Sequence, residues 1–247
     1  MVALLGPSNF EYLITIFALS RLGYSVLLLS NRLAVIAYEF LVEKTNSEWI
    51  VYSSRFAATV ALLNRTRSIG AVPMLTKADF GTHRSNSPFI HTAIDRETYT
   101  HKTSFIIHSS GSTGLPKPIF QTHAACLKSY SLGSGKVAFT TLPLYHNFGI
   151  ANAYRSMFKH KEIYFHNANV PQTGQGLAEI IECAKPGIIA AVPYTYKLLG
   201  ETQRGVNALK SCDIVMSGGS ACPDDLGNRL VKHGVNLIVQ FGSYVSL

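Results

Sequence analysis

A segment rich in glycine and hydroxyl side chains lies near the middle of the chain. It reads Ser-Ser-Gly-Ser-Thr-Gly-Leu-Pro-Lys over residues 109–117, directly after the apolar run 104–108. Glycines let a backbone approach a ligand closely and adopt positive φ angles. Exposed backbone N–H groups, hydroxyl groups and the ammonium group of Lys117 supply the donors and the positive charge that a polyphosphate needs. The segment therefore indicates a phosphate-binding loop.

The spacing of this loop excludes two common alternatives and leaves a third open. In the GxxxxGKS/T loop of nucleotide triphosphatases a Gly precedes the Lys, whereas Pro116 precedes Lys117 here. A GxSxG nucleophile elbow does not occur in the chain. A flexible Gly/Ser linker is the third alternative, because such segments are common. The ordered Gly-x-x-Gly-x-Pro-Lys spacing immediately after an apolar strand argues against a linker.

The first 75 residues alternate between helical and strand-like patterns. A side-chain oxygen of Ser8 or Asn9 can cap a helix that runs to about Leu22. The apolar run 26–29 is typical of a strand covered on both faces. Further helices are expected at 33–44 and from about residue 56, and strands at 49–52 and 71–74. This rotation predicts a parallel sheet flanked by helices.

The rotation resumes after a polar stretch. Residues 77–102 are polar and without periodicity, which is typical of a surface connection. Strands are expected at 104–108, 136–140, 162–165, 187–191, 212–216 and 235–240, with helices in most intervals. The predicted fold class is α/β, with mostly parallel sheets flanked by helices. We expect one globular unit over residues 1–247, and the alternative is a weak subdivision near residues 77–102.

The composition favours a folded protein without a nucleic-acid partner. Apolar residues make up 47% of the 247 residues and charged residues 15%, and the formal net charge is +8. Lys and Arg are scattered, without a basic run or an aromatic-basic ladder that could follow a nucleic-acid backbone. A general attraction for anionic ligands such as nucleotides accounts for the charge equally well.

Cysteine usage and the N-terminal segment favour a cytoplasmic location. The four cysteines form no CxxC pair and are interpreted as small buried residues of a reduced protein. The apolar stretch 10–30 contains Glu11 and Arg21, so it lacks the run of about 20 apolar residues that a membrane span needs. The N-terminus shows neither the basic flank nor the cleavage pattern of a signal peptide. We expect no membrane span.

Residues 109–117 closely resemble the nucleotide-binding signature of the adenylate-forming (AMP-binding) superfamily, usually Ser/Thr-Ser-Gly-Ser/Thr-Thr-Gly-x-Pro-Lys. That superfamily includes acyl-CoA synthetases, luciferases and nonribosomal peptide synthetase (NRPS) adenylation domains. Further segments resemble the family in the expected order, namely 6–23, 27–33, 142–149, 190–193 and 217–223. The residues around the loop are most similar to fungal NRPS-like adenylating reductases. The resemblance covers nearly the whole chain.

The resemblance implies a ligase reaction and a set of site residues. The parent reaction joins a carboxylic acid to ATP, with Mg²⁺, to give an acyl-adenylate and pyrophosphate, and then transfers the acyl group to a thiol such as that of a carrier protein. His146 matches a histidine beside the acyl substrate; a histidine with only a structural role is the alternative. The expected ATP-binding residues are Ser109, Ser110, Gly111, Ser112, Thr113, Gly114, Lys117, Gly218, Gly219, Ser220, Phe241, Gly242 and Ser243.

Two of these assignments carry an alternative or a departure from the family pattern. Residues 218–220 can equally be a plain tight turn before a helix that starts at Pro223. Near the end of the chain, Val245 stands where the resemblance places a Mg²⁺-binding glutamate, and valine offers no oxygen to a hard cation. No metal ligand is therefore assigned.

The sequence also leads us to expect an N-terminal part of the family's large domain, without the C-terminal subdomain that carries a lysine for adenylation. On that expectation the chain is truncated and is weak or inactive alone. A non-catalytic nucleotide- or acyl-binding module is the first alternative function, and a ligand-free scaffold fragment is the second. The identity of the acid and the oligomeric state are left open.

Overall fold

The computed structural model describes residues 1–80, 95–109 and 114–242, except for the side chain of residue 96. The chain divides into two compact units, Met1–Leu127 and Lys128–Leu247. This division lies after residue 127; a subdivision near 77–102 stays a prediction, because residues 81–94 are outside the described ranges. Within those ranges, the helices are too short or too polar to cross a bilayer.

The first unit is built on a six-stranded sheet in the order β4-β3-β1-β2-β5-β6. Its five strands from β4 to β5 are parallel to their neighbours, and β6 is antiparallel to β5. The strands are β1 (Val2–Leu5), β2 (Val26–Leu29), β3 (Trp49–Tyr52), β4 (Gly70–Pro73), β5 (Thr103–His108) and β6 (Pro118–Thr122).

Helices pack on this sheet as the hydrophobic pattern predicts. Helix α1 (Phe10–Arg21) begins at Asn9, whose side chain accepts a hydrogen bond from the Tyr12 amide at 3.0 Å, and it packs against β2. Helices α2 (Val35–Lys44) and α3 (Ala57–Thr66) bury Leu41 and Leu63 in one core with alternate residues of the central strands. The 3₁₀ turn η1 (Ser54–Phe56) precedes α3.

Two strands and one helix of this unit did not follow from the sequence. β1 is the central strand, yet it has only four residues at the very start of the chain, too few to show a period. β6 begins with Pro118, which is tolerated because a proline can occupy the first residue of an edge strand. The short α4 (Arg96–Thr100) lies in the polar stretch and is capped by the Asp95 carboxylate.

The second unit carries a five-stranded, fully parallel sheet in the order β11-β10-β9-β7-β8. Its strands are β7 (Ala138–Thr140), β8 (Ile163–Phe165), β9 (Ile188–Ala191), β10 (Ile214–Ser217) and β11 (Leu237–Val239). Its helices are α6 (Asn147–Phe158), α7 (Gly174–Ala184), α8 (Pro193–Leu199), α9 (Gln203–Lys210) and α10 (Asp224–Lys232), while α5 (His123–Ser131) runs across the boundary between the units.

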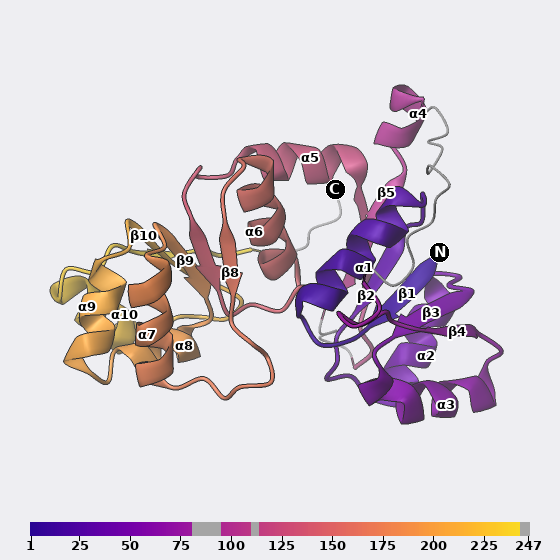
Figure 1. The fold of residues 1–247 in the computed structure, drawn as a ribbon, viewed down its shortest axis with the longest axis horizontal. Helices are drawn as coiled ribbons and strands as arrows, with labels where there is room; N and C mark the ends of the chain where they lie inside the picture. Colours follow the sequence, from indigo (N-terminus) through magenta and orange to yellow (C-terminus); the bar gives the residue numbers. More distant parts are fainter. Residues whose placement is uncertain (81–94, 110–113, 243–247) are drawn as a thin grey trace. The chain divides into compact units, whose positions relative to one another are not determined.

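Helices cover this second sheet unequally. Helices α7–α10 share a core with β7, β9 and β10, in which the rings of Phe139 and Tyr196 are fully buried. Figure 1 shows these four helices, in orange and yellow, gathered beside the strands, whereas α6 packs against β7 and β8. The strands expected at 136–140, 162–165, 187–191, 212–216 and 235–240 are all confirmed, each within two residues at its ends. The predicted α/β fold class is confirmed.

Candidate functional site

The glycine-rich loop is closed at its root by β5 and β6. These strands pair up to His108 opposite Pro118. Beyond that pair, the Ser109 amide donates to the Lys117 carbonyl at 3.1 Å, and the Lys117 amide lies 3.4 Å from the Ser109 hydroxyl oxygen. The two ends of the loop are thereby fixed to each other. Residues 110–113 lie outside the described ranges, so Ser110, Gly111, Ser112 and Thr113 stay predictions.

Lys117 and Gly114 have the properties that a phosphate loop requires. The Lys117 side chain is exposed, so its ammonium group can meet an incoming anion. Gly114 has a φ of +110°, a conformation that side-chain-bearing residues rarely adopt. Glycine is therefore needed at position 114 for its backbone conformation.

His108, the last residue of β5, makes hydrogen bonds at the root of the loop, a role that the sequence did not reveal. It is 4% exposed, and its Nε2 atom accepts a hydrogen bond from the Ser30 amide at 3.0 Å. A neutral imidazole that accepts at Nε2 carries its proton on Nδ1, and Nδ1 lies 3.4 Å from the Ser109 carbonyl oxygen. Burial lowers the pKa of His108 below its usual 6.5, because the charged ring would lose its hydration.

In the second unit, the residues expected at the site follow the carboxyl ends of parallel strands. Gly218 follows β10, and its amide donates to the Ala191 carbonyl at the end of β9 at 3.2 Å. The Gln240 amide, after β11, donates to the Ser217 carbonyl at 2.7 Å. These bonds bring three strand ends together at one edge, which is where ligands bind in open parallel sheets.

Glycine is required at two places along this edge. A Cβ atom on Gly218 would lie 2.8 Å from the Phe148 ring and 3.3 Å from the Gln240 carbonyl oxygen. Gly219 has a φ of +83°. Residues 219 and 220 form a bend after β10, and Gly218 packs directly against Phe148 of the His146 element. The site roles assigned to residues 218–220 stay predictions.

The His146 element is a turn that starts a helix. The His146 amide donates to the Pro143 carbonyl at 3.2 Å, and His146 is the N-cap residue of α6. A Cβ atom on Gly149 would overlap the same Pro143 carbonyl, so only glycine lets the helix begin this close to the turn. The His146 side chain is exposed, and its ring lies 4.9 Å from the buried Tyr145 ring.

Buried threonines hold this edge together, and the sequence gave no signal for them. The Thr140 hydroxyl donates to the Ala190 carbonyl at 2.8 Å and accepts from the Leu142 amide at 3.1 Å. The Thr195 hydroxyl donates to the Gln172 side chain at 2.9 Å. Both threonines are at most 1% exposed. They set the path of the chain from β7 into the His146 element.

The remaining predicted site residues lie near the end of the chain, where the described ones are not packed against other residues. The Phe241 side chain is 91% exposed, and a Cβ on Gly242 would meet no described atom within 4 Å. Ser243 and Val245 lie outside the described residues. Among the residues that are described, no group of three or more His, Cys, Asp or Glu side chains could hold a metal ion.

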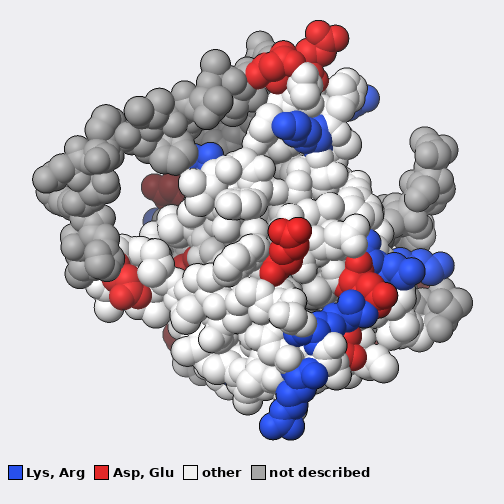
Figure 2. Space-filling view, turned by 90° about the vertical axis from the view of Figure 1, so that its right-hand side faces the viewer, with Lys and Arg blue, Asp and Glu red and all other residues white. Residues whose placement is uncertain are grey.

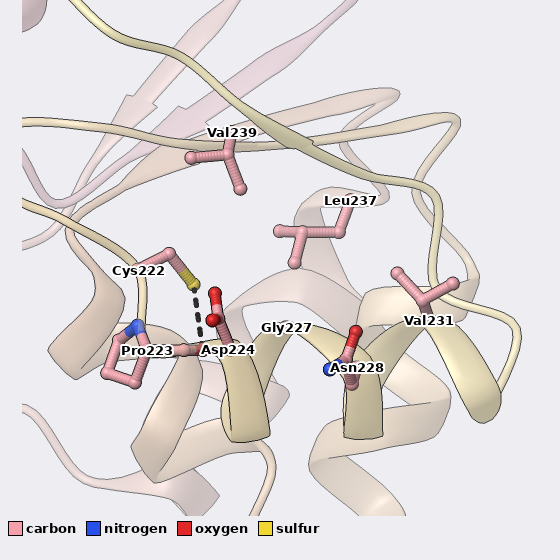
Figure 3. A pocket seen from close by; sticks show the side chains of 8 residues that line it. All are labelled: Cys222, Pro223, Asp224, Gly227, Asn228, Val231, Leu237 and Val239. Carbon is pink, nitrogen blue, oxygen red and sulfur yellow. Dashed lines mark hydrogen bonds between the residues drawn. The ribbon is translucent and has the colours of Figure 1, made fainter.

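A hollow of about 220 Å³ lies between α10 and β11 (Figure 3). Its lining includes Leu237 and Val239 of the strand and Cys222, Asp224 and Asn228 at and near the start of the helix. The volume is below the roughly 300–1,000 Å³ of typical small-molecule sites. We assign no ligand to this hollow.

Charges on the face shown in Figure 2 are mixed. Lys and Arg side chains lie among Asp and Glu, and much of this face is uncharged. Such a distribution lacks the continuous basic stripe by which proteins follow a nucleic-acid backbone.

Comparison with known proteins decides the family. The model of the family described as AMP-binding enzyme matches residues 1–243. The chain belongs to this family. It is 30% identical to an adenylate-forming reductase of Aspergillus terreus, over 98% of this chain and 24% of that protein. It is 24% identical to a feruloyl-CoA synthase of Amycolatopsis, over 98% of this chain and 48% of that protein.

Solved structures of AMP-binding enzymes share the fold. A luciferase-like enzyme from the Zophobas morio mealworm superposes with a TM-score of 0.81 at 20% identity, covering 99% of this chain and 60% of that one. O-succinylbenzoate CoA synthetase of Bacillus subtilis, in complex with ATP and magnesium ion, gives 0.79 at 20% identity over 96% of this chain and 48% of that one. The chain spans about a quarter to a half of the curated relatives named above.

These findings confirm the family inferred from the sequence and its likeness to fungal adenylate-forming reductases. The relatives named above are described as an adenylate-forming reductase and a feruloyl-CoA synthase, and the activity of this chain is a proposal. The roles of individual residues, the cofactors of this chain and its partners are not tested by the comparisons. They are proposals, to be argued from the site itself.

Proposed function

We propose that this chain binds ATP and a carboxylic acid and takes part in forming an acyl-adenylate. In that reaction a carboxylate oxygen attacks the α-phosphorus of ATP, the bond from this phosphorus to the bridging oxygen breaks, and pyrophosphate leaves. The developing negative charge lies on the leaving pyrophosphate. A site for this reaction therefore needs fixed donors and a cation around the terminal phosphates.

The root of the 109–117 loop is the observation that carries this proposal. The paired strands β5 and β6 and the Ser109–Lys117 hydrogen bonds fix the two ends of the loop to each other. The exposed Lys117 ammonium group stands at one of these ends, and the Ser109 hydroxyl stands at the other. A charged donor and a hydroxyl that are already positioned suit the β- and γ-phosphates of ATP.

The sheet edge of the second unit suits an acyl-adenylate for a different reason. Here Gly219 exposes backbone instead of a side chain, while Gly218 is buried against the Phe148 ring, which supplies an apolar surface. The His146 side chain is exposed at the start of α6. We assign this edge to the acyl group and the adenine, with Ser220, Phe241 and Gly242 in supporting positions.

Mg²⁺ belongs to the reaction as the family carries it out, but the described residues offer it no cluster of ligands. The roles proposed for Ser109 and Lys117 need no metal ion, because both side chains donate hydrogen bonds to phosphate oxygens. A carrier-protein thiol as acyl acceptor and a cytoplasmic location complete the proposal.

A non-catalytic nucleotide-binding module is the second candidate, and Val245 favours it. Valine at the position where the resemblance places a magnesium-binding glutamate removes a metal ligand. Loss of one such electrostatic element typically costs a factor of about 100–1,000 in rate. Carboxylate-dependent exchange of pyrophosphate into ATP separates the candidates. Because Val245 removes a metal ligand, we expect only weak exchange from the 247 residues. ATP binding without any exchange would favour the non-catalytic module, and robust exchange would exclude it.

Nucleotide binding is tested by calorimetry with ATP. Lys117→Ala should weaken the affinity for ATP tenfold or more, since a charge-assisted hydrogen bond contributes roughly 1.5–3 kcal/mol. Lys77→Ala is the matched control, because Lys77 is also exposed and its loss changes the net charge equally. Equal affinities for the two variants, or no binding by the wild-type chain, would contradict the proposal and favour a ligand-free scaffold.

A further inference from the structure

The root of the 109–117 loop is held by the main chain on one side only. β5 pairs with β6 as far as His108 opposite Pro118. On its other side β5 pairs with β2, and there the register covers Val26 opposite Phe105 and Leu27 opposite Ile106. The last two residues of β5 therefore extend beyond the ladder that joins them to β2.

The imidazole of His108 spans this gap. Its Nε2 atom accepts from the Ser30 amide, the first residue after β2, at 3.0 Å. The side chain thus supplies the acceptor that a strand carbonyl would otherwise provide. Residues 78 positions apart in the chain are joined by this bond, and it is buried, where water does not compete for the donor.

Ser30 is in turn fixed from a second element. The Tyr38 hydroxyl of α2 donates to the Ser30 carbonyl at 2.8 Å. On the other side of the ring, Nδ1 faces the Ser109 carbonyl, and Ser109 is bonded to Lys117. A continuous series of hydrogen bonds therefore runs from α2 through Ser30 and His108 to both ends of the loop.

Only the neutral ring can complete this series. A second proton on the ring would place an N–H group at Nε2, directly facing the N–H donor of Ser30. Both groups would then be donors, and the bond would be lost. The buried surroundings of the ring favour the uncharged form and so keep the acceptor available.

We propose that neutral His108 is a positioning residue that ties the root of the 109–117 loop to the end of β2 and thereby sets the affinity for the nucleotide phosphates. The inference rests on the proposed function, because the loop must bind ATP for its position to matter. His108 touches no phosphate in this scheme. It acts through Ser109 and Lys117, which do.

Two substitutions at His108 separate positioning from simple core packing. Glutamine carries its amide oxygen about as far along the side chain as Nε2, so His108→Gln can still accept from the Ser30 amide. Asparagine reaches only about as far as Nδ1, so His108→Asn leaves that amide without its acceptor. The two variants share the same functional group and differ in reach, and exchange of the Ser30 amide with solvent distinguishes a lost acceptor from lost packing volume.

A readout without nucleotide tests the tie itself. In the ¹⁵N NMR spectrum of the wild-type chain, the His108 ring should show the tautomer with the proton on Nδ1. Exchange of the Ser30 amide with solvent should be slow in the wild type and in His108→Gln, and at least tenfold faster in His108→Asn. An Nε2-protonated ring, or equal Ser30 exchange in all three proteins, overturns the inference whatever the nucleotide does.

ATP affinity, measured by calorimetry on the same folded proteins, tests the consequence. His108→Asn should bind ATP about fivefold to tenfold more weakly, since one net hydrogen bond is lost, and His108→Gln should stay within about threefold of wild type. Tyr38→Phe, which removes the other bond to Ser30, provides a control expected to lie between them. Equal affinity of wild type and His108→Asn, or equal weakening by both amides, refutes positioning. A wild-type chain that binds no ATP refutes the proposed function first, and the inference with it.

Discussion

The two units each place their candidate residues at an end of parallel strands and hold them with hydrogen bonds, but only the second packs glycine backbone closely against its neighbours as well. In the first unit, hydrogen bonds fix the loop root, through His108 to Ser30 and through Ser109 to Lys117. In the second, the backbone of Gly218 lies directly against the Phe148 ring, and Gly149 lies against the Pro143 carbonyl.

This difference matches the ligand that each edge is proposed to meet. A triphosphate needs a cation and N–H or O–H donors held in place, and a polar frame can hold them while leaving Lys117 exposed. An acyl group and a base need a shaped, mostly apolar surface, which close packing of glycine and an aromatic ring provides. The comparison predicts that the first edge is sensitive to the loss of hydrogen bonds and the second to added volume.

Added volume at Gly149 should have the largest effect. Gly149→Ala would overlap the Pro143 carbonyl, a backbone atom that cannot rotate away, so we expect a loss of about 3 kcal/mol in the free energy of unfolding. Gly227→Ala is the matched control, because Gly227 lies inside α10 and its new Cβ would meet only ordinary contacts at 3.8 Å or more. That variant should gain about 0.5–1 kcal/mol. Urea unfolding measures both, and losses of equal size would break the comparison.

A smaller cost is expected at Gly218, because the obstacle is a side chain. Gly218→Ala would bring its Cβ within 2.8 Å of the Phe148 ring, which can shift, so we expect a loss of about 1–2 kcal/mol. In a double-mutant cycle with Phe148→Leu, part of that loss should be recovered, since the smaller side chain leaves room. Strictly additive losses in urea unfolding would show that the ring does not define the space above Gly218.

Acidification should destabilise the folded chain through its partly or fully buried histidines. Burial lowers the pKa values of His108, His123 and His166 below the usual 6.5. Below pH 6.5 the unfolded chain therefore binds more protons than the folded chain. Stability is then complete above pH 6.5 and declines as the pH falls, by up to about 1.4 kcal/mol per pH unit for each proton. Urea unfolding at pH 7.5, 6.5 and 5.5 should show a shallower decline in His108→Gln than in wild type. Identical declines would exclude His108 as a contributor.

The smallest expected effect is a difference in cysteine reactivity between the two units. Thiol labelling measures it for each unit separately. Cys183 is exposed and should react first in the native protein. Cys212 is 3% exposed, and burial raises its pKa to about 11, so it should react only on unfolding. Cys126 of the first unit is also buried. Mass spectrometry across a urea series should show whether Cys126 and Cys212 become reactive together. Rapid native labelling of Cys212 would contradict the packing of the second unit.

Most of the fold could be predicted from the sequence because local patterns encode it. The apolar run 26–29 is fully buried as β2, and Asn9 caps α1 as its side chain allows. β1 could not be predicted, because it has four residues at the very start of the chain and pairs with distant segments. β6 was missed because it begins with Pro118. For the candidate site, the loop at 109–117 and the segments around His146 and Gly218 were recognisable as motifs. Why Gly218 must be glycine was not, because the obstructing Phe148 ring belongs to a distant part of the chain. At Gly149 the obstacle is the nearby Pro143 carbonyl, whose position depends on how the turn folds back on the helix.

The sequence by itself determined the α/β rotation, the family and the residue types that could meet a phosphate, since these depend on local order along the chain. Only the tertiary structure decided that His108 is a buried acceptor for Ser30, because nothing local links residues 78 positions apart. It also decided which strand ends meet at one edge of the second sheet, through bonds such as that between Gln240 and Ser217. Long-range hydrogen bonds and close packing arise only when distant segments are brought together, and that is where the structure adds to the sequence.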